Sequence, residues 1–164
     1  MSKRKYNSKL TQFQLAYDIA RNAHAGRMDK SGFPEFLHPF LVMKMCKTDK
    51  QRCIALLHDV VEETRDTANP ITLDYLLAAG IDEDIVKAVA NMTREKGEGV
   101  GHYLDRVASD EDSCEVKRLD MIENMSSRRN VRLPEEERRR KRRKYEPRLK
   151  KLLAKRETLQ IERE

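Results

Sequence analysis

Residues 50–64 have the sequence KQRCIALLHDVVEET, and this stretch decides the fold. Its apolar residues recur every three or four positions, which is the spacing of a helix with one buried side. When the residues are placed at about 100° per position, the polar ones gather on one strip and the apolar ones fill the remaining arc. The strip consists of His58, Asp59, Glu62 and Glu63. The spacing therefore predicts one amphipathic helix over about residues 50–64, with Thr48 as its N-cap.

The same helical spacing continues along most of the chain. It predicts a first helix from Leu10 to about Gly26, further helices near residues 38–45, 73–79, 83–93, 102–109 and 112–127, and a last one after Pro134. The sequence has no run of alternating β-branched residues bounded by turns, so no strand is predicted. We expect an all-α fold in a single domain, residues 1–164, with a core over 1–127 and a basic helical segment over 128–164.

Composition narrows the class of protein further. The chain lacks any run of the roughly 18 apolar residues that a membrane span needs, and no apolar segment follows its basic start as a secretory signal would require. Three cysteines, an odd number with no CxxC pair, argue against a disulfide scaffold or a cysteine-based zinc site. We therefore expect a cytoplasmic protein without a membrane partner.

Positive charge is concentrated at the end of the chain. The formal net charge is +6, and residues 126–164 hold 16 of the 34 basic side chains but only 7 of the 28 acidic ones. This distribution does not support attraction of nucleic acid to the whole surface. The run EEERRRKRRK at 135–144 predicts either a nucleic-acid contact or, as charge runs more often are, a solvated helix.

The solvated-helix interpretation makes two structural predictions. It predicts ion pairs one turn apart, such as Glu135–Arg139 and Glu137–Lys141. It also predicts a narrow apolar seam that docks the helix on the rest of the molecule. The seam consists of Tyr145, Leu149, Leu152 and Leu153.

The polar strip of the helix over 50–64 has two interpretations of its own. An imidazole and three carboxylates without a lysine or arginine should repel one another unless a cation lies among them. A solvated helix face would have a similar composition. Elsewhere in the chain His38 begins an apolar helix, and Asp120 and Asn124 lie one turn apart. Imidazoles and carboxylates together form a mixed nitrogen and oxygen ligand set, which suits manganese, iron or zinc.

Three segments of the chain resemble the successive signatures of the HD-domain metal phosphohydrolases. They are AHAGRMDKSGFPEFLHPF at 23–40, ALLHDVVEETRDT at 55–67 and VKRLDMIENM at 116–125. The branch they resemble most is that of the RelA/SpoT-type hydrolases, including its small single-domain members, which cleave the alarmone (p)ppGpp. The resemblance covers roughly residues 10–150. It implies a compact multi-helix HD-domain fold.

The resemblance also implies a role for particular residues. The metal ligands of the family fall on His38, His58, Asp59 and Asp120, with Mn²⁺ as the expected metal and other divalent ions as alternatives. The acidic pair that positions and deprotonates the attacking water falls on Glu62 and Glu63. We expect Glu62 to be the closer of the two, because it lies about 40° from His58 on the helical wheel. The substrate-binding positions fall on Lys30, Ser31, Asn124 and Ser127.

The activity implied by the resemblance is release of pyrophosphate from the 3′ position of guanosine-3′,5′-bis(diphosphate), the nucleotide of the stringent response. Many members of the family have an arginine that stacks on guanine at the position of Asp29. This difference keeps a second hypothesis open, an HD phosphohydrolase for another nucleotide. A third hypothesis is a nucleic-acid-binding protein that uses the basic C-terminal helix and has a non-catalytic metal site.

Overall fold

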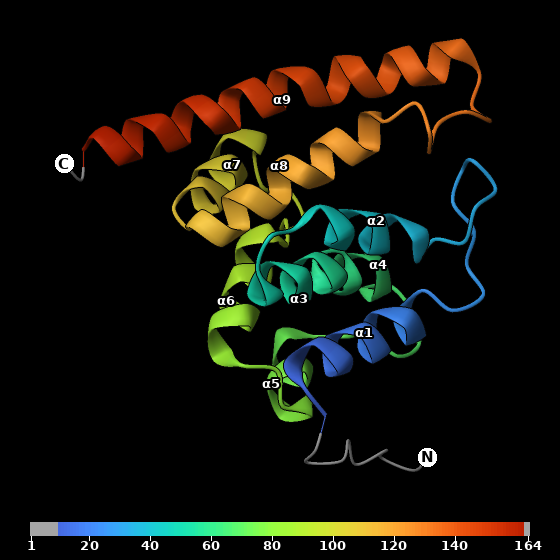
Figure 1. Ribbon diagram of the computed structural model, residues 1–164, viewed down its shortest axis with the longest axis vertical. Coiled ribbons are helices and arrows are strands. Elements are labelled where there is room, and N and C mark those ends of the chain that lie inside the picture. The colour runs from blue at the N-terminus through green and yellow to red at the C-terminus, as the bar shows by residue number, and fades with distance from the viewer. Residues whose placement is uncertain (1–9, 163–164) are drawn as a thin grey trace.

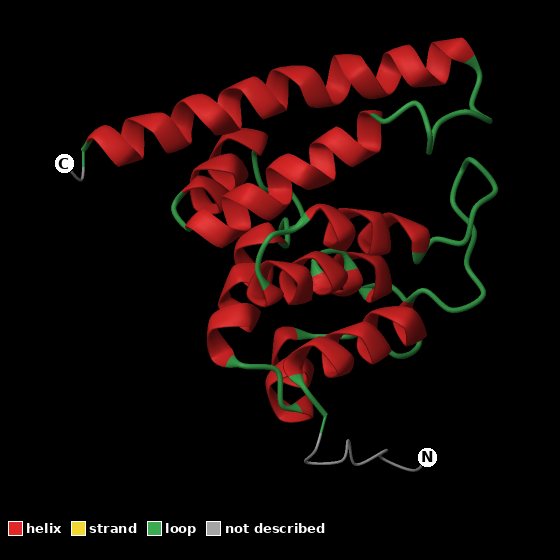
Figure 2. Ribbon diagram, in the orientation of Figure 1, coloured by secondary structure: helices red, strands yellow, loops and turns green. Residues whose placement is uncertain are grey.

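The computed structural model describes residues 10–162, and regular structure in that range is helical apart from one isolated bridge between Met28 and Pro34 (Figures 1 and 2). The all-α prediction is confirmed. The helices are α1 (Gln12–Ala23), α2 (Leu37–Met45), α3 (Asp49–Leu57), α4 (Val60–Thr64), α5 (Leu73–Ala79), α6 (Glu83–Met92), α7 (Val100–Ala108), α8 (Glu111–Met125) and α9 (Glu135–Ile161). The basic start of the chain, residues 1–9, and residues 163–164 lie outside the described range. Among the described helices, none has the length and apolar character to cross a membrane.

The main hydrophobic core surrounds α3. This helix contacts α1, α2, α6 and α8, and every side chain from Cys53 to Leu57 is at most 1% exposed. Burial of each large apolar side chain stabilises the fold by about 1.5–3 kcal/mol. The residues that follow α3 in the sequence are thereby held close to the centre of the molecule.

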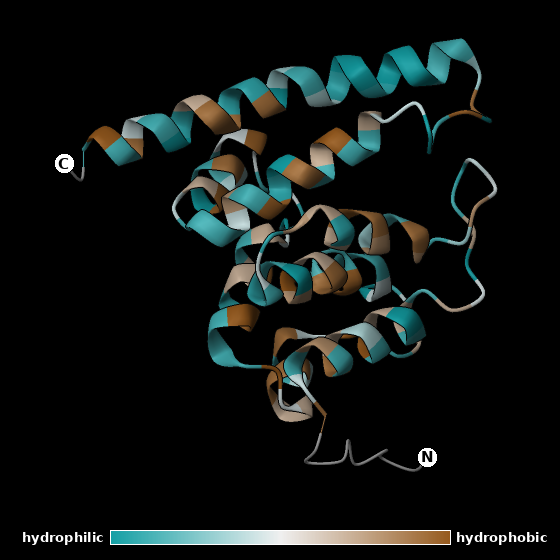
Figure 3. Ribbon diagram, in the orientation of Figure 1, coloured by the Kyte–Doolittle hydropathy of each residue, from teal (hydrophilic) through white to brown (hydrophobic). Residues whose placement is uncertain are grey.

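A second hydrophobic cluster attaches α9 to the rest of the molecule. The long helix lies across α7 and α8 (Figure 1), and Leu152 is fully buried there beside Tyr145, Leu149 and Leu159. Leu153 is 45% exposed, so the predicted seam is wrong at this position. Positions 145, 149, 152 and 159 share one face at 3.6 residues per turn, whereas the residue after Leu152 points about 100° away. The N-terminal half of α9 is almost continuously hydrophilic (Figure 3).

The helix predicted over residues 50–64 is interrupted. Thr48 does cap α3, since its side chain accepts a hydrogen bond from the Gln51 N–H, but α3 ends at Leu57 and α4 begins at Val60. In a continuous helix the Ala55 carbonyl would accept the Asp59 N–H. Here that carbonyl accepts a 2.6 Å hydrogen bond from Nδ1 of His58. The imidazole of His58 thus takes the carbonyl that the next backbone N–H would use. The helix is interrupted at His58 and Asp59, the two residues for which the sequence predicts metal binding.

Candidate metal centre

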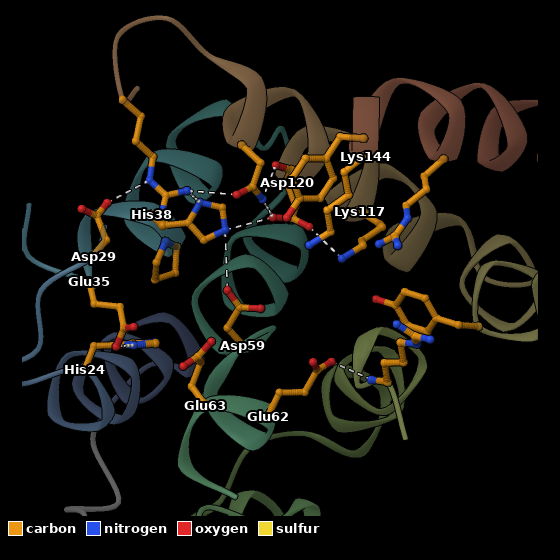
Figure 4. Close-up of a pocket in the computed structure, with 17 residues that line it drawn as sticks. His24, Asp29, Glu35, His38, Asp59, Glu62, Glu63, Lys117, Asp120 and Lys144 are labelled. Atoms are coloured by element: carbon orange, nitrogen blue, oxygen red, sulfur yellow. Dashed lines mark hydrogen bonds and ion pairs between the residues drawn. The ribbon is translucent and has the colours of Figure 1, made fainter. Parts of the chain in front are cut away.

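Four ionisable side chains from three parts of the fold converge beside the main core. His38 comes from α2, His58 and Asp59 from the junction of α3 and α4, and Asp120 from α8. Nε2 of His38 lies 2.9 Å from Oδ1 of Asp120, and Nε2 of His58 lies 3.1 Å from Oδ2 of Asp59. The two crossed distances, His38 to Asp59 and His58 to Asp120, are both 3.6 Å. Figure 4 shows Asp59 and Asp120 facing the same edge of the His38 ring. We call these four residues the His–Asp cluster.

The hydrogen bonds of the two imidazoles fix which ring nitrogen faces the cluster. Nδ1 of His58 donates to the Ala55 carbonyl, which can only accept, and Nδ1 of His38 donates to Oε2 of Glu123 at 2.6 Å. When Nε2 of either ring has lost its proton, its lone pair therefore points at the carboxylates. Nε2 of His58 is buried and makes no hydrogen bond within the described residues.

This arrangement fits a divalent cation. Ligand atoms held about 2.0–2.2 Å from one ion lie roughly 3.0–3.6 Å from each other, which matches the spacing in the cluster. His38, His58 and Asp120 together offer ligand atoms that all lie within 4.8 Å of one another, and all three are buried. Two imidazole nitrogens and carboxylate oxygens are a donor set typical of manganese, iron or zinc.

Charge within the cluster is strongly coupled. Burial opposes a positive charge on the imidazoles, but the facing carboxylates outweigh it and raise the pKa of His38, and raise that of His58 further. Burial likewise opposes a negative charge on Asp120, yet Lys117 and the imidazoles hold its pKa well below the ordinary range. Nζ of Lys117 lies 2.8 Å from Oδ2 of Asp120. Protons on the imidazoles balance the carboxylates when no cation is bound, and a cation would have to displace them.

His38, Asp59 and Asp120 of the cluster line a cavity of about 320 Å³. Its lining includes the carboxylates of Glu35, Glu62 and Glu63 and the cations of Arg94, Lys117, Lys144 and Arg148. Lys144 and Arg148 belong to α9, so part of the basic C-terminal helix faces the cavity. A second chamber of about 320 Å³ adjoins it and shares Asp29, Glu35, Arg129, Lys144 and Tyr145 with it.

The acidic pair predicted to act on water is held by different partners. Oε1 of Glu62 accepts a 2.6 Å hydrogen bond from the Arg94 backbone N–H, and burial raises the pKa of Glu62. Oε2 of Glu63 forms a 2.7 Å ion pair with Arg27, whose Nε also lies 2.7 Å from Glu35. Both glutamates line the cavity. Glu63 is already matched by a cation, whereas Glu62 faces the cavity with a backbone partner.

The predicted substrate-binding residues are not all in one place. Asn124 lines the main cavity and donates to Oδ1 of Asp120 at 2.7 Å. Lys30 and Ser31 line the second chamber. Ser127 lies instead in a small separate pocket with Arg138 and Arg142. It leaves the helix face of Asp120 and Asn124 because α8 ends at Met125, two residues earlier than predicted.

Sequence reasoning missed three residues around the site. Glu123 is 4% exposed and orients His38, and its position three residues after Asp120 on one helix could have indicated it. His24 is 3% exposed, lines the cavity and belongs to a quoted segment, and burial lowers its pKa. Arg129 lies in a loop, where no periodic pattern could have indicated it.

No protein-family model matches this chain, and no curated protein matches it either. The resemblance to the HD-domain phosphohydrolases therefore depends on the three quoted segments. The fold and the site define an all-helical protein with a His–Asp cluster, three of whose four residues are buried, beside a cavity lined by charged side chains.

Proposed function

We propose that this protein is a metal-dependent phosphohydrolase that acts on a phosphorylated nucleotide, with Mn²⁺ as its metal and (p)ppGpp as the favoured substrate. The observation that carries the proposal is the His–Asp cluster, in which two imidazole nitrogens and two carboxylates face one another beside a cavity lined in part by lysine and arginine. Metal-dependent hydrolysis of a phosphate ester uses a bound cation together with nearby cationic side chains that hold the phosphate.

The residues of the cavity suit separate roles in such a reaction. His38, His58, Asp59 and Asp120 would hold the cation, which when bound acidifies water and polarises a phosphoryl oxygen. Glu62 would accept the proton of the attacking water, since its raised pKa brings it closer to that of an efficient general base near neutral pH. Glu63, paired with Arg27, would orient that water rather than take its proton.

The lysine and arginine side chains that line the cavity favour an anionic substrate. Lys144 and Arg148 from α9 line the cavity together with Lys117. Burial together with the neighbouring Arg148 and Lys117 lowers the pKa of Lys144, so these cations are crowded and a bound phosphate would relieve their repulsion. Two adjoining chambers with Lys30 in the second favour an elongated substrate with more than one anionic group.

One observation favours the second hypothesis, a nucleotide other than (p)ppGpp. Asp29 accepts the backbone N–H groups of Ser31 and Phe33, and it pairs with Arg129 at 3.3 Å. A carboxylate held in this way offers no cationic plane for a guanine base to stack on. The base recognised by the site therefore needs a direct test.

The test is hydrolysis by the full chain after metal removal and reloading with Mn²⁺. We expect release of pyrophosphate from ppGpp and pppGpp, measured beside GTP, deoxynucleoside triphosphates and NADPH. Asp59→Ala should abolish both Mn²⁺ binding and turnover, and Asp74→Ala, at an exposed aspartate of α5, should leave both unchanged. Turnover of another nucleotide alone would replace the substrate. An Asp59→Ala variant that keeps both Mn²⁺ binding and turnover would contradict the proposed function.

The hypothesis of a nucleic-acid-binding protein predicts a different outcome, a protein that hydrolyses none of these nucleotides and binds RNA or DNA. The exposed cations of α9 argue against it, because Arg139, Arg140 and Arg143 pair with glutamates of the same helix.

A further inference from the structure

Arg129 is a buried cation between α8 and α9 whose side chain is only 10% exposed. Its Nη1 lies 3.1 Å from Oε2 of Glu123 and 3.1 Å from Oδ1 of Asn124. Its Nε lies 3.3 Å from Oδ2 of Asp29. One guanidinium therefore meets three acceptors from two segments of the chain, α8 and the loop before α2.

Two of these acceptors hold residues of the His–Asp cluster. Glu123 accepts the 2.6 Å hydrogen bond from Nδ1 of His38, and Nη1 of Arg129 approaches that nitrogen to 3.0 Å around the shared carboxylate. Asn124 donates to Oδ1 of Asp120 at 2.7 Å. Arg129 is thus one residue removed from both His38 and Asp120.

The third acceptor belongs to the substrate side of the site. Asp29 accepts the N–H groups of Ser31 and Phe33, at 2.8 and 3.0 Å, and so shapes the loop that places Lys30 and Ser31 along the second chamber. Arg129 joins this loop to the metal centre.

We propose that Arg129 is a positioning residue that fixes the orientation of two metal ligands, His38 through Glu123 and Asp120 through Asn124, and ties the loop at Asp29 to them. The inference rests on the proposed metal centre. The planar guanidinium matters because it directs several donors in fixed directions, which the single ammonium group of lysine does not.

A simpler role would be charge compensation alone. Glu123 and Asp29 are both largely buried, at 4% and 10% side-chain exposure, and a buried carboxylate without a partner is strongly destabilising. Positioning and compensation make different predictions once the two carboxylates are neutral.

The first measurement is the dissociation constant of Mn²⁺, obtained by titration calorimetry on the full metal-free chain. Arg129→Met should weaken binding about 10–100-fold, the usual effect of removing a group that orients a metal ligand. Arg129→Lys should fall between Arg129→Met and the wild type. The matched control is Arg156→Met, because the Arg156 side chain is 13% exposed and its guanidinium lies against Ala108 and Glu111, away from the cavity. This control should bind Mn²⁺ as the wild type does.

The decisive comparison uses a variant in which the two carboxylates that face Arg129 have been made neutral. Asp29→Asn and Glu123→Gln together keep a carbonyl acceptor at each position and remove both charges, so Arg129→Met added to this pair leaves no buried carboxylate unpaired at these two sites. Positioning predicts that the added change still weakens Mn²⁺ binding by tenfold or more, because Asn124 loses its anchor. Compensation alone predicts equal affinity in the double and triple variants.

Failure of this inference is distinguishable from failure of the proposed function. A wild-type chain that binds no Mn²⁺ contradicts the metal centre itself. A wild-type chain that binds Mn²⁺, together with equal affinity in the double and triple variants, overturns the role of Arg129 and leaves the metal centre standing. Circular dichroism of each variant confirms that the compared chains are folded.

Discussion

The His–Asp cluster and the solvent-facing side of α9 are both crowded with charge, yet they differ in every other respect. The cluster draws its groups from α2, the α3–α4 junction and α8, and three of its four residues are buried. On α9, Glu135 pairs with Arg139 four residues away, and these side chains are 60% and 64% exposed. Exposed pairs of this kind contribute about 0–1 kcal/mol each, whereas the buried groups shift one another's pKa strongly. The charged groups of the cluster are mostly buried and come from distant parts of the chain, as expected for a binding site. Those on the exposed side of α9 are solvated and pair with near neighbours in the sequence.

Helix α9 contains both kinds of charge on one element. Lys144 and Arg148 line the cavity, while Arg139 and Arg143 are exposed and pair with glutamates of the same helix. The predicted pair Glu135–Arg139 is present. In the other predicted pair the partners differ, since Glu137 contacts Arg140, and Lys141 donates to Asn130 in the loop before the helix. The function of a cation on this helix therefore depends on its angular position.

On the cavity side, substitutions in the acidic pair should have a large effect on turnover. Glu62→Gln is expected to lower kcat by about 10²–10⁴-fold, the usual contribution of a general base. Glu63→Gln should cost less, because Arg27 already pairs with that carboxylate. Steady-state kinetics of both variants with saturating Mn²⁺ provide the measurement. Equal losses would show that the two glutamates are not divided in this way.

The attachment of α9 should depend on its buried face alone. Leu152→Ala should lower the free energy of unfolding by about 2–5 kcal/mol, because it leaves a cavity in the second cluster. Leu153→Ala is the matched control, since this neighbouring leucine is 45% exposed and its loss should change stability by about 0.5 kcal/mol or less. Urea denaturation of the two variants tests this. Similar losses in both would mean that α9 docks through a broader face.

The cluster should give the metal-free protein an unusual dependence on pH. The folded-state pKa of His38 and of His58 is raised above the ordinary 6.5, so their contribution to stability is full below that pH and is lost as pH rises through the folded-state pKa values. The free energy of unfolding of chelator-treated protein should therefore fall above pH 6.5, by at most about 1.4 kcal/mol per pH unit for each imidazole.

Added Mn²⁺ should oppose this decline, because metal ligands must lose their protons to bind. His58→Gln should remove much of the decline, while His102→Gln, at an exposed histidine, should preserve it. Denaturation curves at several pH values measure both. A stability that rises with pH above 6.5 in the metal-free wild type would contradict the charge coupling described for the cluster.

The smallest effects are expected on the exposed side of α9. Arg139→Gln and Arg143→Gln should each change the free energy of unfolding by about 0.5 kcal/mol or less and leave hydrolysis unaffected. Binding of RNA or DNA, measured against salt concentration, tests the same surface. A steep salt dependence that these substitutions remove would reverse the solvated-helix interpretation and favour a nucleic-acid contact.

Local signals predicted the elements of this fold well. The helix over 73–79 matches α5 at both ends, because Thr72 caps it and Gly80 adopts the left-handed conformation, with φ of 100°, that ends it. The break at His58 was not predictable from periodicity, since it arises from a hydrogen bond between a side chain and the backbone. Leu153 was misplaced because it lies at the edge of the arc that Tyr145, Leu149 and Leu152 share on the helical wheel, and the apolar pattern does not show where on that arc the contact with a partner helix ends.

The candidate site was predictable only in part. The residues of the His–Asp cluster were all identified from residue type and the quoted segments, but their convergence is a product of tertiary packing around α3. Arg129 could not be predicted from the sequence, because it lies in a loop that has no periodic pattern. Its partner Asp29 lies 100 residues earlier in the chain, and its partners on α8, Glu123 and Asn124, lie six and five residues earlier. The end of α8 at Met125, which directs Ser127 to another pocket, likewise depends on local capping that the apolar pattern does not record.

The interruption between α3 and α4 sets a limit on how this protein can be engineered. A redesign that straightened residues 57–60 would give the Ala55 carbonyl to the Asp59 N–H and displace Nδ1 of His58 from that carbonyl. Thermostabilisation guided by helix propensity would select that change first. Stability and the proposed metal binding compete at this junction, and a stabilised variant should keep residues 57–60 unchanged.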